Sequence, residues 1–169
     1  TKKSEIKDPN NNVINLDNFH YNIKKNIFTS NGYISFEDLK KNKYEFSQLF
    51  LDTNKKEILG TDIKAYLNQD DFKLNENNKP RVFANSALIK KESKTFEKSI
   101  FTSCNYRDND KCPPWSIQSS KLFHDSLKKT VYYDNAVIKV YDIPILYIPK
   151  LSHPDPTVKR RSGFLTPSF

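Results

Sequence analysis

The chain has 169 residues, a formal net charge of +8, and 36% hydrophobic and 13% aromatic residues. This length suits one domain, and the chain contains no run of about 18 apolar residues that could span a membrane as a helix. The charge favours anionic partners such as nucleic acid, acidic lipid or phosphorylated glycans, but a lysine-rich solvated surface accounts for it equally well.

Residues 1–12 are polar and are predicted to be disordered. From there on, polar and apolar residues alternate in short segments separated by turn-forming Asn, Asp, Lys and Pro. The clearest are "GYISFEDL" (32–39), "KYEFSQLFLD" (43–52), "DIKAYLN" (62–68) and "VIKVYDIPILYIP" (137–149). Alternation with a period of two is typical of half-buried strands, so the sequence predicts a mainly β chain.

An internal repeat indicates how the strands are arranged. The segments 27–36, 82–91 and 131–140 share one plan, in which Ile34, Ile89 and Ile138 occupy the same place. Weaker copies begin at 58 and 100, which gives a spacing of roughly 25–30 residues, typical of stacked supersecondary units. The sequence therefore predicts a β-solenoid, a roll or an elongated jelly roll. The small residue in each main copy (Gly32, Ala87, Ala136) is expected to mark a bend.

One side chain in two along each strand should point into a shared interior. The residues predicted to point inward are Ile34, Phe36, Phe46, Phe50, Ile63, Ile89, Ile138 and Val140. Two interpretations fit this set. The side chains fill an ordinary core, or they line an apolar slot for a long lipid.

No catalytic site, metal site or cofactor motif is evident. The three glycines are far apart, and neither a nucleophile elbow nor a zinc-protease motif is present. His124 with Asp125 resembles a turn more than a dyad, and His153 with Asp155 lacks a third ligand. The main rival function is that of a binding module of another class, either a binder of single-stranded nucleic acid or a protein-interaction module. Basic charge and aromatic side chains on a sheet suit the first of these. The lysines, however, are interspersed with acids, and no recognition motif is present.

The two cysteines, Cys104 and Cys112, bracket a polar loop. A disulfide across that loop would indicate an oxidising compartment. Two free thiols remain the alternative.

The last third of the chain contains the most specific motifs. These are Pro-Pro-Trp at 113–115, "HD" followed by "KKTVYY" and "NA" within 124–136, and "IPILYIPKLSHPDPTVKRRSGFL" at 143–165. In these motifs, and in the repeated strand units before them, the chain resembles the LptD family of LPS-assembly proteins. The resemblance covers nearly all of residues 20–169.

The resemblance implies a fold, a function and a location. It implies that residues 13–150 form a twisted periplasmic β-jelly roll like that of the bridge protein LptA, with an apolar groove for lipopolysaccharide. Such a domain is no enzyme and binds no nucleic acid. It passes the lipid to an outer-membrane β-barrel, plugged by the lipoprotein LptE and absent from this chain, on the periplasmic side of a Gram-negative outer membrane.

The resemblance also implies roles for the two ends of the domain. It implies that residues 151–169 form a hinge to the barrel. The hinge residues are Pro154, Pro156, Lys159, Arg160 and Arg161. It also implies that the bridge protein docks on the strand pair near 13–36. Cys104 and Cys112 pair with each other or with barrel cysteines.

Overall fold

The computed structural model describes residues 4–7, 13–39, 41–68, 79–104, 114–154 and 158. The regular elements of this part are eleven β-strands. They are β1 (Ser4–Lys7), β2 (Val13–Leu16), β3 (His20–Asn22), β4 (Ile27–Glu37), β5 (Lys43–Asp52), β6 (Glu57–Tyr66), β7 (Arg81–Ile89), β8 (Ser93–Thr102), β9 (Trp115–Asp125), β10 (Thr130–Val140) and β11 (Ile143–Pro154). Within the described ranges, no helix has the length and apolar character needed to cross a membrane.

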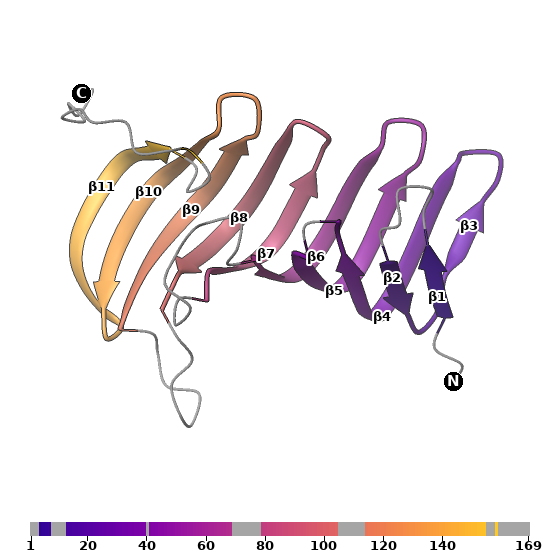
Figure 1. Cartoon of the computed structure of the whole chain (residues 1–169), viewed down its shortest axis with the longest axis horizontal. Coiled ribbons are helices and arrows are strands. Elements are labelled where there is room, and N and C mark those ends of the chain that lie inside the picture. Colours follow the sequence, from indigo (N-terminus) through magenta and orange to yellow (C-terminus); the bar gives the residue numbers. More distant parts are fainter. Residues whose placement is uncertain are drawn as a thin grey trace.

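The strands form one antiparallel sheet in the order β1-β2-β4-β5-β6-β7-β8-β9-β10-β11, and β3 pairs with β4 beside β2. From β4 onward each strand pairs with the next in the chain, so the sheet is a row of hairpins (Figure 1). The prediction of a mainly β chain is confirmed. The sheet is open, with β1 and β11 at its two ends, so closure into a jelly roll stays a prediction.

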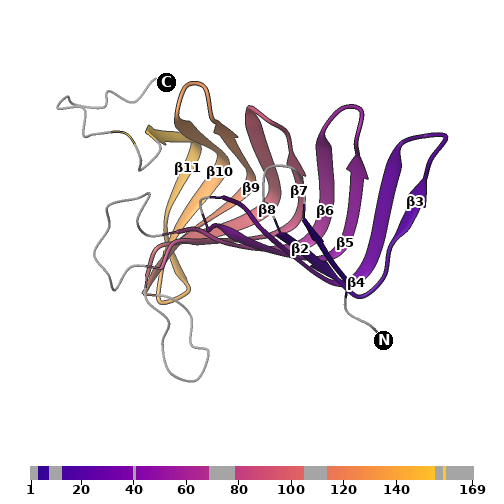
Figure 2. The ribbon, with the colours of Figure 1, turned by 45° about the vertical axis from the view of Figure 1, so that its right-hand side comes forward.

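The long strands bend where a line of irregularities crosses the sheet. Every second strand has one residue of positive φ on this line, namely Gly32 (φ 101), Asp62 (φ 51), Lys98 (φ 50) and Asn135 (φ 53). The pairing between β4 and β5 shifts register at the first of these positions. Because the irregularities are aligned, the whole sheet folds along them into two limbs (Figure 2).

The two limbs differ in their connections. The hairpin limb consists of the strand halves that end at four tight turns, residues 23–26, 53–56, 90–92 and 126–129. The strand halves beyond the bend form the opposite limb. The hydrophobic core lies between the limbs, built from inward side chains of both.

The bend also changes which residues of a strand point inward. In β5, Tyr44 and Phe46 are buried, the next two residues are both exposed, and Leu49 is buried in place of Phe50. Phe50 lies on the outer face with 40% of its surface exposed, so its predicted inward position is wrong. Strict alternation fails here because two residues of the bend separate consecutive inward positions.

The predicted bends at small residues are close to the observed line. Gly32 lies on it, and Ala136 directly follows Asn135.

The ends of the domain differ from the sequence prediction. β1 lies within residues 1–12, where disorder was expected, because it pairs with β2 in regular register. β11 continues past residue 150 and ends at Pro154, so the first residues of the expected hinge belong to the sheet.

The positive φ of Lys98 predicts an unusual order of substitution effects. Lys98→Gly should raise the free energy of unfolding by up to about 1 kcal/mol, and Lys98→Val should lower it by about 1–2 kcal/mol, because only glycine adopts this conformation without strain. The neighbouring Glu97 has an extended backbone, so there the glycine variant should be less stable than the valine variant. Urea unfolding of the four variants measures this, and the same order at both positions would contradict the bend.

Candidate functional site

The interior between the limbs is lined by cross-strand rows of side chains that run the length of the sheet. The row nearest the bend on the hairpin limb is Ser30, Leu49, Gly60, Ala87, Phe96, Leu122, Tyr133 and Leu151. The row facing it on the opposite limb includes Ile34, Phe46, Ile63, Ala84, Ser99, Ser119, Ala136 and Ile148. Most of these side chains are apolar and fully buried, so the limbs pack directly on each other.

Small residues allow the limbs to approach closely. A Cβ atom on Gly60 would overlap Cδ1 of Phe46, so the aromatic ring occupies the space that any side chain at 60 would need. Further along, Ser99 and Ser119 are buried and share a hydrogen bond of 2.8 Å between their hydroxyls. Every buried side-chain polar atom in the described part has a partner, as a dry interior requires.

One lysine reaches across the interior. Lys94 lies on the inner face of the hairpin limb, between Ile89 and His124 in its row. Its ammonium donates a hydrogen bond of 2.8 Å to the hydroxyl of Tyr44 on the opposite limb and lies 5.3 Å from the centroid of that ring. This contact, here called the Lys94–Tyr44 bridge, ties together strands β8 and β5, which are not neighbours in the sheet.

A second polar contact lies near the last strand. The Tyr133 hydroxyl is 3.0 Å from Nε2 of His153, and their rings lie 5.5 Å apart. Burial raises the pKa of Tyr133 far above its ordinary value, so the residue is a neutral phenol. Nδ1 of His153 lies 2.8 Å from the Pro154 carbonyl oxygen, so both ring nitrogens face protein oxygens. Among the residues described, no three His, Cys, Asp or Glu side chains gather as a metal site would need.

The structure places the predicted groove residues in three groups. Ile34, Phe46 and Ile63 are fully buried between the limbs. Half-buried positions in inner-face rows are occupied by Phe36, Ile89, Ile138 and Val140. Phe50 lies outside. Their contact with a lipid stays a prediction.

Sequence reasoning missed much of the inner face of the hairpin limb. The missed residues are Leu49, Leu51, Phe96, Leu122 and Tyr133. The turn positions in the sequence were a usable signal, because counting alternate residues in both directions from each turn reaches these side chains.

The predicted hinge and disulfide are only partly described. Pro154 ends β11, whereas Pro156, Lys159, Arg160, Arg161 and Cys112 lie outside the described residues. Cys104 is half-buried, and its carbonyl oxygen accepts a hydrogen bond of 2.6 Å from the buried guanidinium of Arg81. Its pairing with Cys112 stays a prediction.

The geometry defines a class of domain: an open antiparallel sheet folded on an apolar interior. No protein-family model matches the chain. It is 40% identical over 55 residues to the LPS-assembly protein LptD of Francisella tularensis subsp. novicida (strain U112), which covers 32% of this chain and 6% of that protein.

Two further relatives give similar values. Identity to the LptD protein of Yersinia pestis bv. Antiqua (strain Antiqua) is 40% over 68 residues, covering 40% of this chain and 8% of that protein. Identity to the LptD protein of Yersinia enterocolitica serotype O:8 / biotype 1B (strain NCTC 13174 / 8081) is 38% over 72 residues. That alignment covers 43% of this chain and 8% of that protein. The aligned segments thus span 6–8% of these relatives, which gives partial support for an LptD-like domain.

The contact between Gly60 and Phe46 predicts a coupled pair. Gly60→Ala should lower the free energy of unfolding by about 1–3 kcal/mol because the added methyl group overlaps the ring. Phe46→Leu should remove most of that cost when the two changes are combined. Urea unfolding of the single and double variants gives the coupling energy, with the neighbouring Thr61→Ala as a control. Purely additive effects would contradict the close packing.

Proposed function

We propose that this chain is the lipid-receiving domain of an LptD-type translocon, which takes up lipopolysaccharide from a periplasmic bridge and passes it to an outer-membrane barrel. The observation that carries the proposal is the continuous apolar interior between the limbs of an open sheet. The partial similarity to LptD proteins supports the same function.

The interior has the dimensions and chemistry that acyl chains need. Neighbouring strands lie about 4.8 Å apart, so the two facing rows, which cross the eight strands β4 to β11, are roughly 35 Å long. Each buried methylene group of a lipid contributes about 0.8 kcal/mol, so a few acyl chains bind without any polar contact. Binding by burial alone involves no bond cleavage, which is consistent with a transporter.

Side chains fill the interior between the limbs, so uptake of a lipid requires the limbs to separate. The cost is moderate, because acyl chains replace apolar contacts between the limbs with equivalent ones. The Lys94–Tyr44 bridge has to break when the limbs part. A domain that opens and closes in this way binds lipid loosely enough to release it, as a transfer step requires.

The two ends of the sheet suit different partners. We assign the N-terminal end of the sheet, near the strand pair 13–36, to an LptA-like bridge protein, which would add a strand beside β1 or β3, the outer strands there. The segment after Pro154 would lead to the barrel and its LptE-like lipoprotein. The domain would then act on the periplasmic side of a Gram-negative outer membrane.

Photo-crosslinking from adjacent residues on opposite faces tests the proposal. A photoreactive amino acid at Ile138 or Ile89 should label lipopolysaccharide, whereas one at Val137 or Leu88 should not, because side chains of neighbouring strand residues point to opposite faces. All four positions are half-buried, so their accessibility is matched. Equal labelling from both faces would argue against lipid between the limbs.

The Lys94–Tyr44 bridge predicts opposite effects on stability and on lipid affinity. Tyr44→Phe removes the acceptor, so the lipid-free chain should lose about 1 kcal/mol of unfolding free energy. The free energy needed to separate the limbs should fall by the same amount, about 1 kcal/mol. Lipopolysaccharide should therefore bind roughly fivefold more tightly. Thermal unfolding and fluorescence titration measure the two effects, with the exposed Tyr132→Phe as a control. Weaker lipid binding by Tyr44→Phe would show that the bridge does not restrain opening.

A further inference from the structure

The four tight turns that end the hairpin limb all contain two consecutive lysines. They are Lys24 and Lys25, Lys55 and Lys56, Lys90 and Lys91, and Lys128 and Lys129. All eight side chains are exposed. These turns lie side by side along one border of the sheet (Figure 1), and the eight residues are here called the lysine row.

Three of the turns fix their lysines by the same local geometry. An Asn or Asp before the turn accepts a hydrogen bond from the backbone N–H of a lysine three residues later, at 3.1 Å in Asn22–Lys25, 3.0 Å in Asp52–Lys55 and 2.9 Å in Asp125–Lys128. The residue after that lysine has positive φ in each turn, with values of 55, 56 and 49. The same lysine position therefore recurs in the same turn conformation.

Neighbouring turns are also joined to each other. Thr53 donates its backbone N–H and its hydroxyl to the Asn26 carbonyl oxygen, at 3.0 and 2.9 Å. Lys90 forms an ion pair of 2.8 Å with Glu57, and the Ser126 N–H donates to the Glu92 carbonyl oxygen at 2.9 Å. The row is therefore continuous, and one turn follows the next at about 10 Å, since each hairpin adds two strands.

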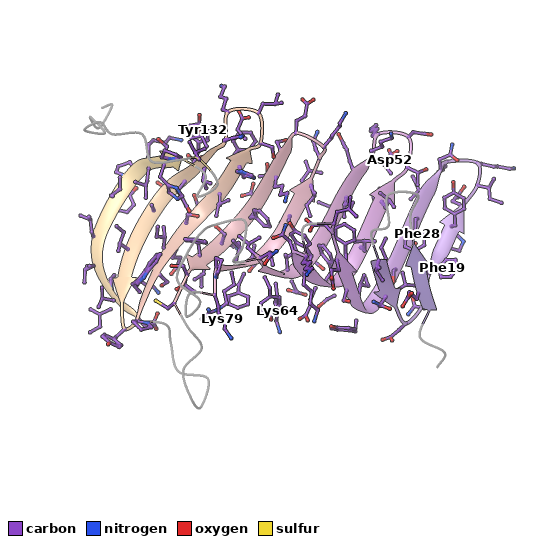
Figure 3. All side chains as sticks on the ribbon, viewed as in Figure 1. Phe19, Phe28, Asp52, Lys64, Lys79 and Tyr132 are labelled. Atoms are coloured by element: carbon purple, nitrogen blue, oxygen red, sulfur yellow. The ribbon has the colours of Figure 1, made fainter. Side chains whose placement is uncertain are left out.

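The row has an excess of positive charge. Four carboxylates flank the eight lysines, those of Asp52, Glu57, Glu92 and Asp125, so four positive charges remain. Two of these acids, Asp52 and Asp125, also accept backbone hydrogen bonds from their turns. Figure 3 shows Asp52 at the base of its turn, whereas Lys64 and Lys79 lie far from this border.

The apolar interior begins directly inside the row. The inward residues nearest the turns form one cross-strand row, which is apolar from β4 to β7 and polar on β8 and β9. Its members are Phe28, Leu51, Ile58, Ile89, Lys94, His124 and Val131. A ligand bound over β4 to β7 would meet an apolar surface directly beside a line of ammonium groups. Phosphorylated amphiphiles have that combination, whereas a nucleic acid has no apolar part for the interior.

We propose that the lysine row binds the phosphate groups of a lipid whose acyl chains lie between the limbs. This inference rests on the proposed function and adds the recognised chemical group and its site. Because the turns are about 10 Å apart, a headgroup with two phosphates contacts neighbouring turns at once, and the second contact forms at high effective concentration.

The test compares binding of native lipopolysaccharide with that of the same lipid after chemical removal of its phosphates. The row variant replaces one lysine in each turn, Lys24, Lys55, Lys91 and Lys128, with glutamine. The control variant replaces Lys41, Lys64, Lys79 and Lys98, which are exposed residues away from the row, so both variants lose four positive charges. Each 169-residue chain is titrated at two salt concentrations.

We expect the row variant to bind native lipopolysaccharide about 10–100-fold more weakly than the unmodified chain, with a reduced salt dependence. Its binding of the dephosphorylated lipid should be unchanged, which also shows that it is folded. The control variant should bind both lipids as the unmodified chain does. An equal loss in the control would overturn the assignment, because net charge alone would then explain binding.

Two other outcomes separate this inference from the proposed function. If the unmodified chain binds both lipids equally, the lysine row does not recognise phosphate, and the proposed function stands. If it binds neither lipid, the proposed function fails and the inference fails with it. Equal, lysine-dependent binding to phosphatidylglycerol vesicles without lipopolysaccharide would make the row a membrane contact and overturn the inference.

Discussion

The aligned bend is the constraint on which the rest of the structure depends. A flat sheet of this length would expose one face of apolar side chains, and no helix in the described part covers it. Folding the sheet along one line lets the two halves of that face bury each other. The bend requires one residue of positive φ in every second strand. Asp62, Lys98 and Asn135 adopt this conformation although they have a side chain, which costs free energy that glycine would not lose.

This solution produces a core that is also a candidate binding site. In most domains, a packed core and a ligand cavity are different places, because a core closed by secondary structure on all sides cannot open cheaply. Here the core lies between two limbs of one sheet that are joined along the bend and bridged elsewhere by side chains such as Lys94 and Tyr44. In the proposed lipid transfer, stability and opening would therefore depend on the same contacts.

The charge pattern follows from the same architecture. Because strands alternate in direction, every second connection lies at the same border, and a turn sequence that recurs with the hairpins builds a line of identical groups there. The lysine pairs of the four turns are far apart in the sequence and become neighbours only in the sheet. The apolar interior and the cationic border then lie next to each other, which suits a ligand of mixed polarity.

The sequence by itself determined the class of fold, the strand at 43–52 and most inward residues of the opposite limb, because period-two alternation and turn residues are local properties. It determined Ile34, Phe46 and Ile63 as interior residues in this way. The segment 137–149, predicted as one strand, is divided by a turn at Tyr141 and Asp142 between β10 and β11, where both residues have positive φ. Only the tertiary structure decided the face of Phe50, the packing of Gly60 against Phe46, and the Lys94–Tyr44 bridge. These features depend on where the sheet folds and on contacts between strands distant in the chain, and local periodicity contains no information about either.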